Sequence, residues 1–281
     1  MSEVKISAAD VKKLRDATGS GMMDCKKALT ESAGDFDGAI EYLRKKGQKM
    51  AGKRADRDAK EGVVIAQVTD NKDKGIVVRL GCETDFVAKN EDFIKMAKEF
   101  ADIAINNAPN DVDALLALPY NDALTIAKKI EEYTGVIGEK IEISKYEMLE
   151  ANGGQVVPYI HMGYRAGVIV AMNLPDADYT DAGKDVAMQI AAMRPVALDK
   201  DQVDPSVVEK EIEIGKDLAR QEGKPEAMIE KIAMGKLNKF YKENTLLNQN
   251  FVKDNKQSVA AYLKSKNPDL TITAFKNIEL G

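Results

Sequence analysis

Val63-Val64-Ile65-Ala66-Gln67-Val68 is followed, after the polar turn Asp70–Lys74, by Gly75-Ile76-Val77-Val78-Arg79-Leu80. Both stretches are short, rich in β-branched residues and bounded by turn residues, which predicts two strands joined by a turn. The loop 81–90 comes next. Behind it, apolar residues recur at the spacing of a helical face: Phe93, Met96, Phe100 and Ile103. The order strand, strand, loop, helix predicts an α+β unit.

The second half of the chain repeats this order. Gly167–Met172 has the composition of a buried strand, and the segment 182–193 carries apolar residues at helical spacing: Ala182, Val186, Ile190 and Met193. Gly75 and Gly167 therefore begin matching strands. We predict two related α+β subdomains packed side by side, over residues 56–145 and 146–281.

Shorter elements complete the two units. We expect a helix over 123–133 after an irregular stretch near Pro109, and a short strand over 139–146. Residues 146–150 and 158–162 flank Gly153-Gly154 and predict a β-hairpin. A helix over 258–265 and a strand over 270–275 would complete the second sheet.

Residues 10–47 predict a compact three-helix unit, placed in an N-terminal domain over 1–55. The second helix starts near Met22 and has Met22, Cys25 and Leu29 on one face. Asp35 is placed to cap the third helix and Gly47 to stop it. Residues 48–62 are basic, polar and contain glycine, so they predict a linker that is helical in part.

A helical hairpin over 204–241 interrupts the second subdomain. Asp204-Pro205 pairs an N-cap residue with proline at the first helical position, and Gly223-Lys224-Pro225 forms a sharp stop between two helical patterns. Each arm would be roughly 25 Å long at the usual helical rise. Because the arms are rich in charge, the hairpin could project as a coiled coil, although two ordinary packed helices fit the pattern equally well.

Composition argues against most enzymes. The chain has one histidine, two cysteines and a net charge of -5. It has no nucleophile elbow, dinucleotide fingerprint or phosphate-binding loop, and its cysteines are too few for a thiolate metal site. No apolar run reaches the length of about 18 residues that suggests a membrane span. We therefore expect a cytoplasmic binding protein with no metal, no cofactor and no covalent chemistry of its own.

Three segments are candidates for binding. In the loop 81–90, Phe86 stands beside Asp85 and is either a tucked core residue or an apolar wedge on a rigid scaffold. Met22 and Met23 are neighbours, about 100° apart on a helix, so they cannot both face the same small core and one should be exposed. The alternative is that this segment only packs in the core. His161 is either a structural hydrogen-bonding residue or part of a binding surface.

At these segments the chain resembles the bacterial translation elongation factor Ts family. Thr18-Gly19-Ser20-Gly21-Met22-Met23-Asp24-Cys25-Lys26-Lys27-Ala28-Leu29 is similar to its N-terminal signature, and Thr84-Asp85-Phe86-Val87-Ala88 to its second one. Further motifs follow in the family's order along nearly the whole chain: Gly138-Glu139-Lys140-Ile141, Tyr159-Ile160-His161, Gly223-Lys224-Pro225 and Gln249-Asn250-Phe251-Val252.

The resemblance implies a guanine nucleotide exchange factor for the GTPase elongation factor Tu, with a ubiquitin-associated-like N-terminal domain and a protruding coiled coil. It implies that Asp85 and Phe86, with Thr84 and Val87, approach the magnesium site of the partner. Other implied contacts are Met22, Met23, Lys26, Ile137, Gly138, His161, Gln189, Phe251 and Val252. Gln189 departs from the family, because many relatives have histidine there.

Two other functions remain open on the sequence. One is a scaffold that binds partners without changing nucleotide affinity. The other is an RNA-associated translation protein that uses the basic stretch Arg44–Arg57. A solvated helix end with a linker is the favoured interpretation of that stretch, and the acidic total charge disfavours general electrostatic binding of nucleic acid. We therefore expect no direct sequence-specific nucleic-acid binding.

Overall fold

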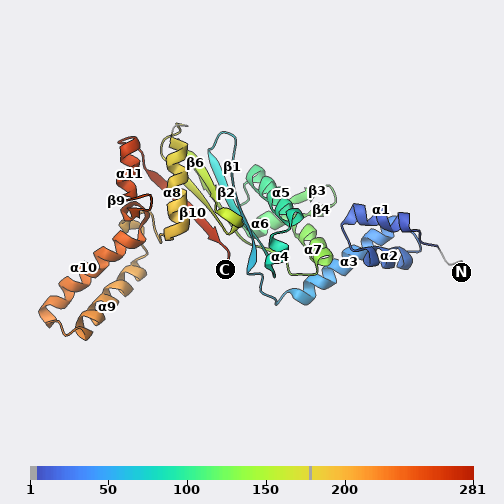
Figure 1. The fold of residues 1–281 in the computed structure, drawn as a ribbon, viewed down its shortest axis with the longest axis horizontal. Helices are drawn as coiled ribbons and strands as arrows, with labels where there is room; N and C mark the ends of the chain where they lie inside the picture. The colour runs from blue at the N-terminus through green and yellow to red at the C-terminus, as the bar shows by residue number, and fades with distance from the viewer. Residues whose placement is uncertain (1–4, 177–178) are drawn as a thin grey trace.

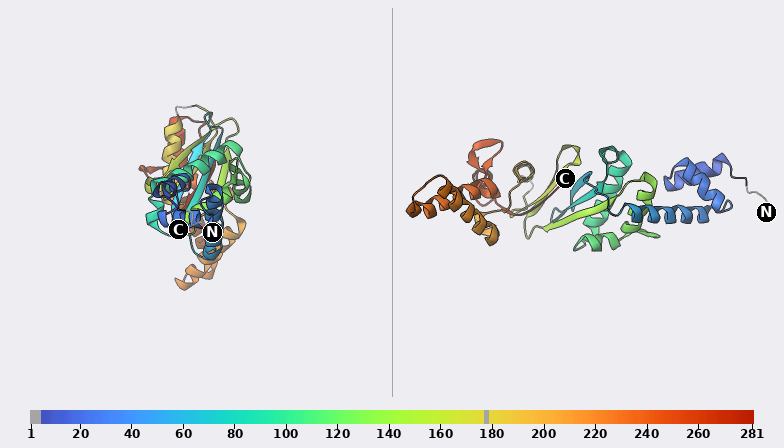
Figure 2. Two further views of the ribbon diagram at one scale, coloured as in Figure 1. Left: turned by 90° about the vertical axis from the view of Figure 1, so that its right-hand side faces the viewer. Right: turned by 90° about the horizontal axis from the view of Figure 1, so that it is seen from below.

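The computed structural model describes residues 5–176 and 179–281, whose elements follow one another along a long axis (Figure 1). Three N-terminal helices lie at one end and a helical hairpin at the other, with two three-stranded sheets and their helices between them (Figure 2). The predicted α+β class is confirmed.

The N-terminal unit is the predicted three-helix bundle. Ser7 caps the first helix in a reciprocal capping box with Asp10, and Asp35 caps the third. A small core of apolar side chains, with Leu14 and Cys25 fully buried, joins the three. The helices are α1 (Ala8–Thr18), α2 (Met22–Glu31) and α3 (Phe36–Arg54).

The prediction that Gly47 stops the third helix is wrong, because α3 continues to Arg54. Gly47 instead lies where α3 crosses α7 (Ile126–Ile137). A Cβ atom on Gly47 would lie 2.8 Å from the carbonyl oxygen of Glu131, and one on Gly135 would lie 2.5 Å from the Gly47 Cα. The missing side chains let the two backbones approach, so the glycine serves helix packing rather than helix termination.

The first sheet has the strand order β1-β2-β5, all antiparallel. Alternate residues of β1 face opposite sides: Val63 and Ile65 pack under the helices, whereas Val64 and Ala66 face the second sheet. The elements are β1 (Glu61–Val68), β2 (Lys74–Cys82), α4 (Asp85–Ala88), α5 (Glu91–Asn107), α6 (Val112–Ala117), β3 (Pro119–Asn121), β4 (Leu124–Thr125), α7 and β5 (Glu142–Glu150). The sequence did not predict α4, α6, β3 or β4.

The second sheet has the order β10-β7-β6 and repeats the first, with the second strand of each unit in the centre. A Cβ on Gly167 would lie 2.7 Å from Val64 of the other sheet, so the glycine permits close face-to-face packing. The elements are β6 (Gln155–Ile160), η1 (Met162–Tyr164), β7 (Ala166–Met172), α8 (Thr180–Met193), η3 (Lys200–Gln202), η4 (Leu246–Asn248), β8 (Asn250–Phe251), β9 (Asp254–Ser258), α11 (Val259–Lys266) and β10 (Ile272–Glu279).

The predicted β-hairpin around Gly153-Gly154 is wrong. β5 pairs with β2 and β6 pairs with β7, so the two segments belong to different sheets. Instead of pairing with each other, the two segments bond to the turn between β1 and β2. The Ala151 N–H donates to the Asp73 carbonyl, and the Val156 N–H donates to the Lys72 carbonyl. Met193, predicted on the buried face of α8, is 46% exposed at the last residue of that helix.

The helical hairpin consists of α9 (Pro205–Gln221) and α10 (Glu226–Asn244). Asp204 caps α9 as predicted, and its carboxylate accepts from the Ser206 N–H at 2.8 Å. The arms meet closely, since a Cβ on Gly215 would lie 3.1 Å from the Ala233 Cα. The hairpin projects from the body (Figures 1 and 2), which decides between the two alternatives that the sequence left open.

Candidate partner-binding surface

The segment after β2 presents an aromatic ring to solvent. Thr84 caps the one-turn helix α4, whose Ala88 is buried and whose Val87 packs on the first core. Phe86 points away from that core and is 83% exposed. The alternative of a tucked core residue is therefore wrong, and the ring is available to a partner.

Asp85 adds a negative charge beside this ring. Its carboxylate lies 2.6 Å from the ammonium of Lys89, one turn further along. The hydrogen bond from Lys89 holds the pKa of Asp85 below its ordinary value, so the carboxylate is ionised at neutral pH. An exposed apolar ring flanked by a carboxylate results, on a segment attached to the sheet at one end and to the core at the other.

The turn after α7 lies at the base of this segment. Gly138 closes α7 in the left-handed conformation, with φ of 80°, and Ile137 is half-buried against the first core. The next residue, Glu139, accepts hydrogen bonds from Thr84. Ile137 and Gly138 therefore adjoin the segment that carries Phe86, and their contact with a partner stays a prediction from the family resemblance.

Met22 and Met23 open α2, and both are exposed, by 43% and 76%. The placement of Met22 on the buried face with Cys25 is wrong. Met22 is the first residue of its helix, beyond the edge of the small core that covers Cys25 and Leu29. Lys26 is exposed as well, so this helix start carries an apolar pair beside a positive charge.

His161 lies at the end of β6 and is exposed. Its Nδ1 lies 3.0 Å from the Tyr159 hydroxyl, so one ring nitrogen has a partner within the chain. The neighbouring Met162 is 87% exposed and is not among the contacts predicted from the sequence. An apolar residue in front of the glycine of a tight turn is the signal that could have identified it.

Two of the expected contact residues are buried. Gln189 has no exposed surface and Phe251 is 3% exposed, with its ring stacked on Tyr262 at 4.1 Å between centroids. Neither side chain can touch a partner in this structure, so the expectation that Gln189 and Phe251 contact the partner directly is wrong. The Gln189 oxygen instead accepts from the Val252 N–H at 2.8 Å, and Val252 is 47% exposed.

The fold brings some of these residues together and separates others. The segments that carry Phe86 and His161 meet at one end of β1, where Glu61 pairs with Cys82 and lies 3.8 Å from Arg165. Val87 and Tyr164 both pack on the first core there. The start of α2 lies apart from them, on the N-terminal helices, and Val252 lies in the turn before β9 on the second unit; Figure 1 shows α2 and β9 far from each other. The candidate surface is therefore extended rather than one cleft.

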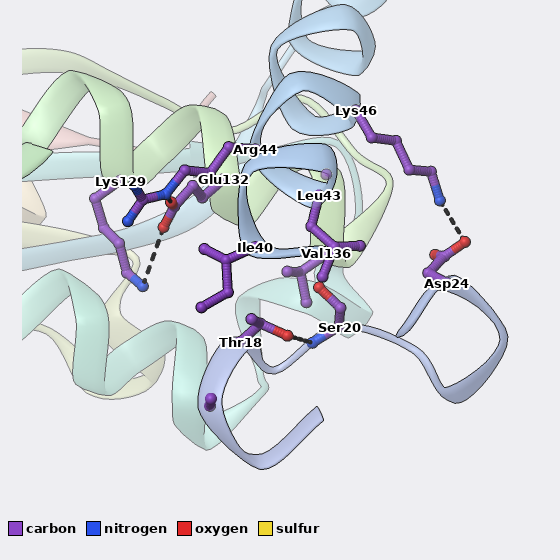
Figure 3. Close-up of a pocket in the computed structure, with 12 residues that line it drawn as sticks. Thr18, Ser20, Asp24, Ile40, Leu43, Arg44, Lys46, Lys129, Glu132 and Val136 are labelled. Atoms are coloured by element: carbon purple, nitrogen blue, oxygen red, sulfur yellow. Dashed lines mark hydrogen bonds and ion pairs between the residues drawn. The ribbon is translucent and has the colours of Figure 1, made fainter. Parts of the chain in front are cut away.

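A cavity of about 150 Å³ lies elsewhere, between the N-terminal helices and α7 (Figure 3). Charged side chains on its wall pair with each other: Arg44 lies 2.6 Å from Glu132, and Lys46 lies 2.5 Å from Asp24. The cavity is the seam at which the bundle packs on the first unit, with its charges satisfied internally.

Within residues 5–176 and 179–281, no cluster of three or more His, Cys, Asp or Glu side chains is placed to hold a metal ion. In the same ranges, no helix combines the length and the apolar composition that crossing a bilayer requires. Both cysteines are buried thiols, and burial raises the pKa of Cys82 to about 12, so it stays protonated at neutral pH.

These features define the class: an elongated α+β protein with a helical bundle at one end, a projecting hairpin at the other and exposed apolar side chains on the small elements between. The family model described as elongation factor TS matches residues 83–281. Proteins named elongation factor Ts from Christiangramia forsetii and Flavobacterium psychrophilum are 54% and 53% identical, over 99% and 98% of this chain and 99% of their own length. One from Porphyromonas gingivalis is 44% identical over 98% of both chains.

The chain belongs to the elongation factor Ts family, and its role is in the elongation phase of translation. The relatives extend over the N-terminal bundle, which lies outside the segment matched by the family model.

Proposed function

We propose that the chain is a guanine nucleotide exchange factor that binds the GTPase elongation factor Tu and promotes release of GDP. The observation that carries the proposal is Phe86, an aromatic ring 83% exposed beside the ionised Asp85 in a chain of this family. Burial of such a ring in a partner removes apolar area from water and so supplies binding free energy.

The proposed mechanism is a competition between two ligands of the GTPase. A GTPase holds GDP through its phosphate-binding loop and through Mg²⁺ that bridges phosphate and protein. A ring inserted near the Mg²⁺ displaces the protein elements that hold this ion. A carboxylate beside the ring competes with the phosphates of GDP for the positive charges of the site. Because binding is reciprocal, a factor that binds the nucleotide-free GTPase more tightly must weaken nucleotide binding by the same ratio.

The remaining exposed residues supply affinity in this proposal. Met22 and Met23 offer flexible apolar side chains, Lys26 a positive charge, and His161 a free ring edge at the same end of β1 as Phe86. Val252 adds a contact on the second unit, held in place by Gln189 from within. Phe251 acts as its packing support.

The exchange role needs no bond to be made or broken in this chain, and no cofactor. We include in the proposal a cytoplasmic location, where the partner acts, and no direct sequence-specific contact with nucleic acid. The division into domains at 1–55, 56–145 and 146–281 also remains a prediction.

The test is release of fluorescent GDP from elongation factor Tu, followed with excess unlabelled nucleotide. We expect micromolar concentrations of this chain to accelerate release severalfold or more. Binding of the partner with no acceleration would contradict the exchange role and support the scaffold alternative. The same experiment with GTP reports whether reloading is also accelerated.

A further inference from the structure

Two turns lie at the base of the segment 84–88 that carries Phe86: residues 83–84 after β2 and residues 139–140 before β5. Hydrogen bonds join them in both directions, and we call this set of contacts the bridge. The Glu83 carboxylate accepts a hydrogen bond from the Lys140 backbone N–H at 2.6 Å. The Glu139 carboxylate accepts one from the Thr84 backbone N–H at 3.0 Å, and the Thr84 hydroxyl donates to its other oxygen at 2.7 Å. Each turn thus supplies a carboxylate to the backbone of the other.

The fold explains why these groups meet. Gly81 of β2 pairs with Glu142 of β5, which brings the residues after β2 beside those before β5. Gly138 ends α7 with φ of 80°, a conformation that L side chains rarely adopt, and the chain reverses there. The reversal directs the next residue, Glu139, toward Thr84.

The bridge also attaches the end of α3. The Arg54 guanidinium donates to the Glu83 carboxylate at 2.6 Å, and the Lys140 ammonium donates to the Ala55 and Arg57 carbonyls at 2.9 Å each. Burial alone would raise the pKa of Glu83, but the hydrogen bonds from Lys140 and Arg54 outweigh it and hold that pKa below its ordinary value. Glu83 therefore carries a full charge, and its hydrogen bonds are charge-assisted.

The short helix α4 depends on this attachment. One helical turn is not stable alone in water, and Phe86, which is 83% exposed, adds little packing on the core. Thr84 caps α4 by accepting from the Val87 N–H at 3.5 Å, a long contact. Its single hydroxyl proton goes to Glu139, which leaves the oxygen lone pairs free to face the end of the helix.

We propose that Glu139 is a positioning residue that, through Thr84, holds α4 in the orientation in which Phe86 meets the partner. The proposal rests on the exchange function proposed above. The turn after Gly138 would then do more than contact the partner. Its Glu139 would set the position of the Phe86 ring through Thr84.

The experiment compares Glu139→Ala and Glu139→Gln with a matched control, Glu142→Ala. Glu142 begins β5 and lies 3.0 Å from the Lys140 ammonium, so the control removes a nearby carboxylate that has no hydrogen bond to Thr84. Release of fluorescent GDP from elongation factor Tu is measured against variant concentration. The maximal rate and the half-saturating concentration are then obtained separately.

We expect Glu139→Ala to lower the maximal rate by about tenfold, the scale of losing charge-assisted hydrogen bonds that order a segment. The half-saturating concentration should change by less than about threefold, since the exposed contacts on α2 and η1 are intact. Glu139→Gln keeps one acceptor oxygen and should lose less, and the Glu142→Ala control should match wild type.

Hydrogen exchange at the Val87 and Ala88 amides gives a second readout that does not depend on the partner. Glu139→Ala should speed their exchange by about tenfold while leaving amides of α5 unchanged. If the wild-type chain does not accelerate GDP release from elongation factor Tu, but Glu139→Ala still speeds exchange at the Val87 and Ala88 amides, the exchange role is wrong while the bridge still holds α4.

Wild-type maximal rate and wild-type amide protection in Glu139→Ala would overturn the proposal, as would equal losses in Glu142→Ala. If Glu139→Ala does not fold, Glu139→Gln decides, because it keeps the length of the side chain and the Thr84 cap but leaves one acceptor oxygen for the two Thr84 donors. A lower maximal rate in that variant supports the positioning role and an unchanged rate overturns it.

Discussion

At the scale of single residues, burial separates the side chains that present a surface from those that support it. Phe86, Met23 and Met162 are more than three-quarters exposed, whereas Gln189 and Phe251 are buried. The family resemblance gave Phe86, Met23, Gln189 and Phe251 alike as contacts, because a motif records which positions matter but not whether their side chains lie on the surface or beneath it.

The hydrogen bonds of the buried Gln189 amide predict how substitutions at this position change stability. It donates to the Gln249 side chain and the Asn250 carbonyl at 3.0 and 3.1 Å and accepts from the Val252 N–H. Replacing Gln189 with leucine leaves these partners unpaired, and we expect a loss of roughly 1–3 kcal/mol in the free energy of unfolding. Denaturant unfolding measures it. Gln189→His, which can still donate and accept once each, should lose less, and equal stability of the leucine variant would show that the amide does not hold this turn.

At the scale of elements, hydrophobic period and capping residues predicted most helices and strands. The turn Gly223-Lys224-Pro225 and the N-cap Asp204 are where the sequence indicated. Strand pairing was predicted less well, because alternation shows which face of β5 is apolar but not which strand lies beside it. The backbone hydrogen bonds by which the β1–β2 turn receives Ala151 and Val156, and so lies between β5 and β6, join residues distant in sequence and have no local signal.

Two glycines of α3 test the account of the helix crossing. In a helix interior alanine is more favourable than glycine by about 1 kcal/mol, so Gly52→Ala should stabilise the chain. Apart from the adjacent residues and the nearby backbone of α3 itself, no described atom lies within 4 Å of the added Cβ. Gly47→Ala places its Cβ 2.8 Å from the Glu131 carbonyl oxygen, and we expect destabilisation by roughly 1–3 kcal/mol. Thermal unfolding compares the two. A rise in melting temperature for both variants would mean that α3 does not pack on α7 in solution.

At the scale of the whole molecule, the candidate contacts are distributed along a long axis. The N-terminal bundle reaches the body through the continuous helix α3, which packs on α7, and the hairpin extends in the other direction (Figures 1 and 2). This shape lets a chain of modest size touch a partner at several separate places. The sequence could predict the parts but not this arrangement. It predicted a linker, helical in part, over 48–62, and it carried no signal that α3 packs on α7.

The extended shape has a measurable consequence. A compact chain of 281 residues would have a radius of gyration of about 19 Å. We expect small-angle scattering in dilute solution to give a clearly larger value, with a distance distribution that has a long tail. A value near 19 Å would show that the bundle or the hairpin folds back on the body.

The central claim is that the exposed ring of Phe86 acts on the partner's nucleotide and not on the fold. It is tested most directly by the rate of fluorescent GDP release from elongation factor Tu with Phe86→Ala, measured beside the melting temperature of the variant. Val196→Ala, which shortens another apolar side chain that is 60% exposed, is the control. We predict at least a tenfold lower acceleration for Phe86→Ala, with a melting temperature within about 2 °C of wild type, because surface substitutions change stability little. Undiminished acceleration, or a fall no larger than that of the control, would contradict the account.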